Sequence, residues 1–395
     1  MTEPSANHGP DFETLGGQAL AHLRLDFRFL DLRSLDRLRR IGLSPAVIQH
    51  LSDLAASLGG LDLGGAASHL LRVTEVQRES LRLHDGHDEQ AARMLPALRT
   101  CLQDTGDALA VGDWVLAHRN EHGQWWAQAR LPPANQLARR LHDGRDKVTR
   151  AVIVSNVDTA LLVMGLDHDY SLRRLERFVA LAHMAGVSAV VVLTKKDLCT
   201  EADARLQQAR AVLPAGTLAL AVNALGDEPA LALAPWLQPA QTLVLLGSSG
   251  AGKSTLTNAL CGGAVADTGA SRNGDSRGRH TTTARTLHCT PGGACVIDTP
   301  GLRTLRLEGD AEELGAAFGD VSRLALSCRF RDCQHENEPG CAVREGVSAE
   351  RLRNFHKLLR EARRDTLTAL ERKAQVSAWK SRTRLGRLRA ESKRG

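Results

Sequence analysis

A glycine-rich loop containing one lysine is the part of the sequence best suited to phosphate chemistry. It reads Gly-Ser-Ser-Gly-Ala-Gly-Lys-Ser and lies between an apolar run and an apolar helical segment. In such a loop, backbone amides and the N-terminus of the helix bind nucleotide phosphates. Lys253 is expected to reach the β- and γ-phosphates, and the Ser254 hydroxyl to ligate Mg²⁺. The predicted phosphate-binding residues are Gly247, Ser248, Ser249, Gly250, Ala251, Gly252, Lys253, Ser254 and Thr255.

A carboxylate and a threonine-rich segment follow this loop. Asp298 opens the string Asp-Thr-Pro-Gly directly after an apolar run, so it can hold Mg²⁺ through water while the Gly301 amide contacts the γ-phosphate. Residues 277–283 read Arg-Gly-Arg-His-Thr-Thr-Thr and predict a mobile switch with a threonine that closes on Mg²⁺. We assign that role to Thr282, although the sequence does not distinguish the three threonines.

A second loop has the residues needed to recognise guanine. In the string Thr-Lys-Lys-Asp, Asp197 can accept hydrogen bonds from both guanine N1 and N2, and the Lys195 stem can lie across the base. A plain surface loop is the alternative, but the string follows an apolar run, as a site residue at a strand end would. A further loop after the next apolar run is expected to complete the base site. The predicted base-binding residues are Thr194, Lys195, Lys196, Asp197, Asn223 and Ala224.

The order of these two loops is unusual, because the base reader precedes the phosphate loop along the chain. Most guanine-nucleotide switches have the reverse order, so the sequence indicates a circularly permuted GTPase. The carboxyl ends of parallel strands share one sheet edge, so the same site forms whatever the chain order.

The residue expected to orient the hydrolytic water is missing. Leu302 and Arg303 follow Asp-Thr-Pro-Gly, where many GTPases have a glutamine. An apolar residue cannot orient water, so intrinsic hydrolysis should be slow and depend on an outside group. His280 is a candidate for that role; the alternative is a solvated histidine in a polar loop.

A short cysteine cluster predicts a metal site. Three cysteines and one histidine lie within 14 residues with few apolar residues between them, which suits a closed structural Zn²⁺ site rather than a catalytic one. The other cysteines (Cys101, Cys199, Cys261, Cys289 and Cys295) are scattered and expected to be reduced. The predicted zinc ligands are Cys328, Cys333, His335 and Cys341.

The elements that must position these residues form a multi-domain chain. Residues 1–65 suggest an accessory helical extension, and residues 66–140 alternate in polarity like the short strands of a small β-barrel. Residues 141–307 alternate strands and helices, which predicts a parallel α/β sheet, and residues 308–395 suggest a helical zinc-binding domain with a basic tail. Strands are expected at residues 152–154, 160–163, 189–193, 218–222, 242–246 and 295–297, and a helix at residues 172–184.

Charge is distributed unevenly along the 395 residues. The net charge is +6, but residues 351–395 alone carry +11, from 15 lysines and arginines against four acidic residues. Such a tail suggests a polyanionic partner, and a solvated helix face is the alternative. No run of 18 apolar residues and no signal-peptide pattern is present, so we expect a cytoplasmic protein without membrane contact.

Taken together, these motifs resemble the bacterial small-ribosomal-subunit biogenesis GTPases, a circularly permuted family often called ribosome biogenesis GTPase A. The resemblance covers roughly residues 70–380 and includes the two nucleotide loops, the Gly-Arg-His-Thr-Thr-Thr string, Asp-Thr-Pro-Gly and the cysteine cluster. It implies an OB-like barrel, a central P-loop GTPase domain and a C-terminal α-helical zinc-binding domain.

The resemblance also implies a function and the roles of residues. It implies GTP hydrolysis stimulated by the small subunit, GTP and GDP as ligands, contact with ribosomal RNA, and a role in late maturation of that subunit. Lys195 and Asp197 would hold guanine, Lys253 and Ser254 the phosphates with Mg²⁺, and His280 corresponds to a histidine associated with hydrolysis. We expect a monomer.

Two other functions compete with this GTPase. One is an RNA-binding module with a nucleotide pocket that serves only regulation, a hypothesis suggested by Leu302. The other, a P-loop kinase or ATP-driven transporter subunit, leaves the Thr-Lys-Lys-Asp string and the permuted order unexplained.

Overall fold

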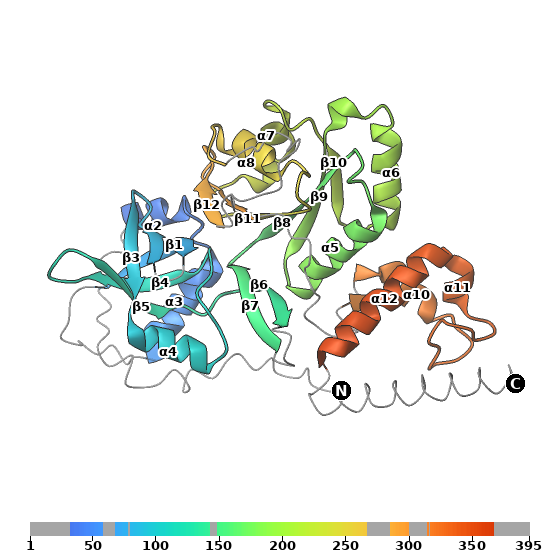
Figure 1. Cartoon of the computed structure of the whole chain (residues 1–395), viewed down its shortest axis with the longest axis horizontal. Helices are drawn as coiled ribbons and strands as arrows, with labels where there is room; N and C mark the ends of the chain where they lie inside the picture. Colours follow the sequence, from blue (N-terminus) through green and yellow to red (C-terminus); the bar gives the residue numbers. More distant parts are fainter. Residues whose placement is uncertain are drawn as a thin grey trace, which may run out of the picture.

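Figure 1 shows the structure, a computed structural model that describes residues 32–57, 68–77, 80–142, 148–266, 285–299, 314–315 and 317–366. From left to right in this view lie a barrel with helices around it, a sheet flanked by helices, and a group of C-terminal helices. Among the residues so described, no helix combines the length and the apolar character that crossing a membrane requires.

The predicted barrel is confirmed and is closed. Its strands are β1 (His69–Gln77), β2 (Ser80–His84), β3 (Glu89–Met94), β4 (Trp114–Arg119) and β5 (Trp125–Arg130). They pair in the order β1-β2-β3-β5-β4, and β4 pairs again with β1. Inward-facing residues such as Val73, Leu83 and Val115 are fully buried, as the alternation of polarity requires.

Two buried tryptophans of the barrel strands lie in different cores. Trp125 packs inside the barrel, whereas Trp114 packs outside it in the core shared with the N-terminal helices and the central sheet, so neither forms an exposed stacking platform. Helix α4 (Pro96–Asp104) begins with a proline in its first turn and buries Leu98 and Leu102 against the barrel.

The central sheet has the strand order β10-β9-β8-β11-β13-β12 and is parallel except for β12. The strands are β8 (Thr159–Gly165), β9 (Ser188–Thr194), β10 (Leu218–Ala221), β11 (Thr242–Leu246), β12 (Thr286–Cys289) and β13 (Cys295–Asp298). Every residue of β8 is buried, and alternate residues belong to two different apolar clusters, so both faces of the sheet are covered. The covering elements are α5 (Leu172–Met184), α6 (Ala202–Val212), α7 (Glu228–Ala232), α8 (Lys253–Cys261), and the 3-10 turns η3 (Lys196–Leu198) and η4 (Ala234–Trp236).

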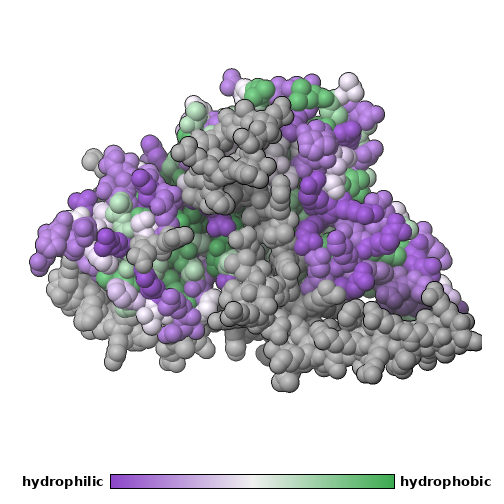
Figure 2. All heavy atoms as spheres, in the orientation of Figure 1, coloured by the Kyte–Doolittle hydropathy of each residue, from purple (hydrophilic) through white to green (hydrophobic). Residues whose placement is uncertain are grey.

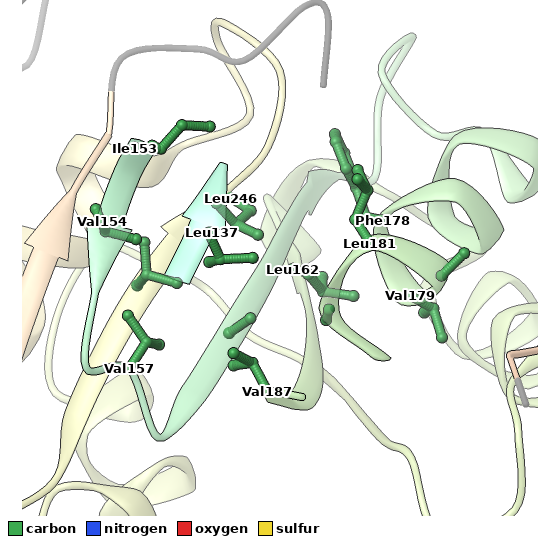
Figure 3. Close-up of a cluster of buried hydrophobic side chains, with 14 of the residues drawn as sticks. Leu137, Ile153, Val154, Val157, Leu162, Phe178, Val179, Leu181, Val187 and Leu246 are labelled. Carbon is green, nitrogen blue, oxygen red and sulfur yellow. The ribbon is translucent and has the colours of Figure 1, made fainter. Parts of the chain in front are cut away.

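One predicted strand does not belong to this sheet. Residues 152–154 lie in β7 (Val148–Ser155), which pairs antiparallel with β6 (Gln136–His142) in a separate two-stranded sheet. Figure 3 shows Leu137, Ile153 and Val154 of this hairpin in one buried cluster with Leu162 of β8 and Phe178 of α5. The prediction was wrong because a short apolar run shows that a segment is buried but not which strand it pairs with.

Two N-terminal helices are integrated into the same core. Helices α2 (Leu32–Arg39) and α3 (Pro45–Ser57) confirm the helical spacing, and Ile41 and Leu43 between them are buried. The Ala240 amide donates to the Arg39 carbonyl (2.8 Å), which joins this segment to the loop before β11. On the barrel side, the buried Arg72 guanidinium of β1 donates to the Ile41 carbonyl.

The C-terminal helices are α10 (Gly319–Ala325), α11 (Ala342–Gly346) and α12 (Ala349–Thr366). Arg351 of α12 joins them to the GTPase sheet, because it pairs with Asp320 (2.7 Å) and with Glu176 of α5 and donates to the Val212 carbonyl (3.0 Å). Figure 2 shows a largely hydrophilic surface over this region. The contact between these helices and α5 is therefore polar as well as apolar.

Candidate nucleotide site and metal centre

The predicted phosphate loop connects β11 to α8 and requires glycine at several positions. Gly250 and Gly252 adopt φ values of 81° and 91°, in the left-handed region that favours glycine. A Cβ on Gly247 would lie 2.3 Å from the Val163 carbonyl oxygen of β8, so a side chain cannot fit there. The loop therefore has the tight shape that presents backbone amides to an anion.

Lys253 and Asp298 face the centre of this loop. The Lys253 ammonium donates to the carbonyls of Gly247 (3.2 Å) and Ser248 (2.8 Å). Burial lowers the pKa of Lys253, and the nearby Asp298 and Asp169 carboxylates oppose that effect. The ammonium thus occupies the loop at the place where phosphate oxygens would meet it.

The residues around Ser254 fit a bound Mg²⁺. The Ser254 hydroxyl donates to Asp298 Oδ2 (3.2 Å). The other carboxylate oxygen, Oδ1, is buried and has no hydrogen-bond partner within the described ranges. Burial raises the pKa of Asp298, while the Lys253 charge and the Ser254 hydroxyl lower it. A divalent cation with its water shell would satisfy the unpaired oxygen and favour the charged carboxylate.

The predicted switch residues lie outside the described residues. These are His280, Thr282 and Gly301, with Leu302 and Arg303 beside them. Within the described residues, Thr286 at the beginning of β12 pairs with Asp298 at the end of β13. These two strand ends lie at the edge of the sheet that holds the phosphate loop, because Asp298 accepts from Ser254.

The base-reading loop is tied directly to the phosphate loop. The Thr194 hydroxyl at the end of β9 donates to the Ala251 carbonyl (2.6 Å). Lys195 has a left-handed backbone (φ 61°), and its ammonium donates to the Gly250 carbonyl (2.7 Å). Asp197 follows in the 3-10 turn η3 with an exposed side chain. The structure thus brings together two strings that lie more than 50 residues apart, as the permuted order predicted.

The second predicted base loop lies beside the first. The side-chain carbonyl oxygen of Asn223 accepts a hydrogen bond from the Leu225 amide (2.9 Å), so Asn223 stabilises its own turn. Ala224 is buried. Glu228 joins the two loops, because it pairs with Lys196 (3.3 Å) and accepts from the Asn223 amide (3.0 Å). Hydrogen bonding lowers the pKa of Glu228, with the Asn223 amide as the main contributor.

Two carboxylates connect the halves of this site, and sequence reasoning assigned neither a site role, although the string Gly165-Leu166-Asp167 also resembles the start of the permuted domain in the family named above. Asp167 pairs with Lys195 (2.7 Å) in the base loop. Asp169 accepts from the Gly165 amide (3.1 Å) and from the Ser248 hydroxyl of the phosphate loop, and it pairs with Arg174 of α5 (3.0 Å). Their position directly after an apolar strand could have indicated a site, but the pairing of β8 with both β9 and β11 was needed to locate them.

The predicted metal ligands lie together. The ligand atoms of Cys328, Cys333, His335 and Cys341 all lie within 4.8 Å of one another. The Cys328 and Cys341 sulfurs are 3.9 Å apart, and His335 Nδ1 lies 3.6 Å and 3.5 Å from them. A tetrahedral zinc with Zn–S about 2.3 Å and Zn–N about 2.05 Å requires S–S edges of about 3.8 Å and S–N edges of about 3.6 Å. The donor set and its spacing therefore fit zinc.

The loop around this cluster is held by a carboxylate that the sequence did not single out. Glu338 accepts hydrogen bonds from the backbone amides of Gln334 (2.9 Å), Glu336 (2.9 Å) and Asn337 (3.0 Å). These bonds lower the pKa of Glu338 to about 2. These hydrogen bonds stabilise the loop in which His335 has a left-handed backbone conformation (φ 61°). This conformation orients the His335 imidazole toward the thiols.

Comparison with known proteins agrees with this geometry. Residues 131–308 match the family described as RsgA GTPase, and residues 242–384 match the family described as 50S ribosome-binding GTPase. The chain is 42% identical over 273 residues to the small ribosomal subunit biogenesis GTPase RsgA 2 of Vibrio vulnificus. The aligned region covers 68% of this chain and 76% of that protein. It is 46% identical over 253 residues to the small ribosomal subunit biogenesis GTPase RsgA of Xylella fastidiosa, covering 63% and 74%.

Solved structures share the fold. YjeQ from Thermotoga maritima superposes with a TM-score of 0.54 at 24% identity, over 75% of this chain and 98% of that one. YloQ, described as a circularly permuted GTPase, superposes with a TM-score of 0.51 at 23% identity, over 76% and 97%.

Proposed function

Because this chain belongs to the RsgA family of GTPases, we propose that it hydrolyses GTP to GDP and phosphate on the small ribosomal subunit and assists late maturation of that subunit. The observation that carries this function is the contact between the base loop and the phosphate loop, made by Thr194 and Lys195 with the carbonyls of Ala251 and Gly250. This contact supports the proposal that a guanine-recognising loop and a phosphate-binding loop share one edge of the sheet.

Each half of the site has a separate task. The exposed Asp197 accepts from N1 and N2 of guanine, which adenine cannot match, and the Asn223 and Ala224 loop borders the base. Residues 247–255 hold the phosphates through backbone amides, and the Lys253 ammonium exchanges its carbonyl partners for β- and γ-phosphate oxygens.

Mg²⁺, when bound, neutralises charge that develops between the β- and γ-phosphates. Ser254 and Asp298 would hold it, with Thr282 as the switch ligand and the Gly301 amide on the γ-phosphate. His280 would position the water. Because Leu302 stands where many GTPases have glutamine, turnover in isolation is slow and rises when the subunit orders the switch.

The cysteine cluster serves structure. Zn²⁺ on Cys328, Cys333, His335 and Cys341 leaves no open position for catalysis, so its contribution is to fold a loop that has few apolar residues.

We divide the chain into four parts on the basis of these assignments: an N-terminal extension to residue 65, the barrel to residue 140, the GTPase domain to residue 307, and the zinc-binding helices with the basic tail to residue 395.

The partners follow from the same assignments. The barrel and the basic tail supply surface for ribosomal RNA, and the protein would act in the cytoplasm as a monomer. Within the part of the site that the structure describes, no feature favours a nucleotide pocket that serves only regulation.

The test is phosphate release from GTP and from ATP, each with and without purified small ribosomal subunits. We expect slow GTP turnover that rises sharply with subunits, and no turnover of ATP. Turnover of both nucleotides would refute the base assignment. GTP binding without stimulated turnover would leave the regulatory alternative, and Lys253→Ala serves as the control that removes the phosphate contact.

A further inference from the structure

Two cysteines outside the zinc cluster lie directly opposite each other across the β12–β13 hairpin. Cys289 pairs with Cys295 in the register of these antiparallel strands. In the next residue pair toward the turn, the Thr290 amide donates to the Ala294 carbonyl (2.8 Å). The Cys295 amide points the other way and donates to the Gln241 carbonyl (2.8 Å). Cys289 and Cys295 are therefore a non-hydrogen-bonded pair, the position where opposite Cα atoms come closest, at about 4.5 Å.

That position matches the geometry of a disulfide. Bridged cysteines have Cα atoms roughly 4.4–6.8 Å apart, so these two could be joined without moving either strand. Both thiols are free in the structure.

The two thiols differ in the way that a nucleophile and its resolving partner differ. Cys289 is exposed, whereas Cys295 is completely buried. The neighbouring Cys295 thiol lowers the pKa of Cys289, whereas the pKa of Cys295, whose thiol donates to the Arg40 carbonyl (3.8 Å), is raised by Cys289 and by burial. An accessible thiol with a lowered pKa beside a buried thiol with a raised pKa is the arrangement of oxidisable cysteine pairs.

A buried cation lies near both thiols and lowers the pKa of each. The Arg72 guanidinium is fully buried, and its described hydrogen bonds go to the Ile41 and Asn156 carbonyls rather than to a carboxylate. Its charge acts on both sulfurs and favours the thiolate of Cys289.

We propose that Cys289 and Cys295 form a peroxide-oxidisable dithiol that closes into a disulfide across the β12–β13 hairpin. The Cys289 thiolate attacks one oxygen of hydrogen peroxide, which forms a sulfenic acid and releases hydroxide. The Cys295 sulfur then displaces the sulfenic hydroxyl, and the displaced group leaves as water with the Cys295 proton. The hydroxide takes up a proton, so one peroxide gives two waters and two thiols give one disulfide.

The disulfide would lie at the junction of the barrel and the GTPase sheet. β12 pairs with β13 on one side and with β1 of the barrel on the other, through Thr286 and Glu75. β13 ends at Asp298, so the bond would fix the strand that presents this carboxylate. The oxidation itself requires no nucleotide, so it can be tested whether or not the GTPase assignment holds.

The sequence provides a direct measurement. Trypsin cleavage after Arg285 and Arg303 releases residues 286–303, a peptide that holds both cysteines and no others. The zinc-loaded, reduced full-length protein is treated with hydrogen peroxide, and its remaining thiols are alkylated before digestion. We expect this peptide to lose both alkyl groups together, to become lighter by two hydrogens than the free dithiol form, and to recover with dithiothreitol.

Variants separate this chemistry from general oxidation. In Cys295→Ser, Cys289 should stop at a sulfenic acid that dimedone traps, and Cys101→Ser, in the barrel helix α4, should leave disulfide formation unchanged. The proposal is overturned if the wild-type peptide stays doubly alkylated while Cys101 is oxidised, or if Cys289 proceeds to sulfonic acid with Cys295 still free.

Discussion

We expect Asp169 to affect how tightly the site binds GTP, although it is not among the residues that we assign to contact the nucleotide. It lies between the phosphate loop and α5, is 7% exposed, and accepts hydrogen bonds from Ser248 and Gly165 while pairing with Arg174. Asp169→Ala leaves these donors without their acceptor, whereas Asp169→Asn keeps an acceptor and removes only the charge.

The magnitude follows from the contacts. Each lost hydrogen bond costs about 1 kcal/mol, and more where a buried donor is left unpaired. The pair with Arg174 adds about 0.5–1 kcal/mol, because the Arg174 side chain is 35% exposed and partly screened. The alanine variant should therefore lose about 3 kcal/mol of stability. The part that orders Ser248, about 1.4 kcal/mol, should raise the Kd for GTP about tenfold.

The assay is titration with a fluorescent GTP analogue, combined with thermal unfolding of the same samples. We expect about tenfold weaker binding for Asp169→Ala, about threefold for Asp169→Asn, and no change for the control Asp203→Ala on the exposed face of α6. Lower stability with an unchanged Kd would refute the reasoning, because Asp169 would then support the fold alone.

Three further predictions concern the base, the barrel and the metal. Asp197→Asn keeps one acceptor and adds a donor that suits the second carbonyl of xanthine. GTP affinity should therefore fall at least about 100-fold while XTP affinity rises. Competition binding measures both affinities, and an unchanged GTP affinity would contradict the assignment. Burial raises the pKa of Asp113 to about 6, so the folded chain binds a proton that the unfolded chain releases near pH 4, and stability falls as pH rises between these values. The free energy of unfolding of Asp113→Asn should then exceed that of the wild type by up to about 3 kcal/mol at pH 7.5 but not at pH 4. Urea unfolding at both pH values measures this difference. An equal gain in stability at both pH values would show that protonation of Asp113 is not its cause. Cys333→Ser removes one of four zinc ligands, so elemental analysis should find zinc lost from the purified variant, and full retention of zinc would show that Cys333 is not a ligand.

Local pattern predicted the elements that bury continuous apolar runs. The helix expected at residues 172–184 and the strand expected at residues 242–246 match α5 and β11 at both ends. The strand at residues 152–154 was placed in the wrong sheet, because its apolar residues pack equally well in the β6–β7 hairpin. Burial is encoded locally, whereas the pairing partner depends on the rest of the chain.

The sequence by itself predicted which residues carry the chemistry. The glycines and lysine of residues 247–254, the Thr-Lys-Lys-Asp string and the cysteine cluster are each confined to a short segment, so their spacing alone predicts a ligand. Only the tertiary structure decided what holds them in place. The contacts of Asp169 with Ser248 and of Lys195 with Gly250 arise from strands that become neighbours on folding. No local pattern encodes them, because register and strand order are set by the packing of the whole sheet.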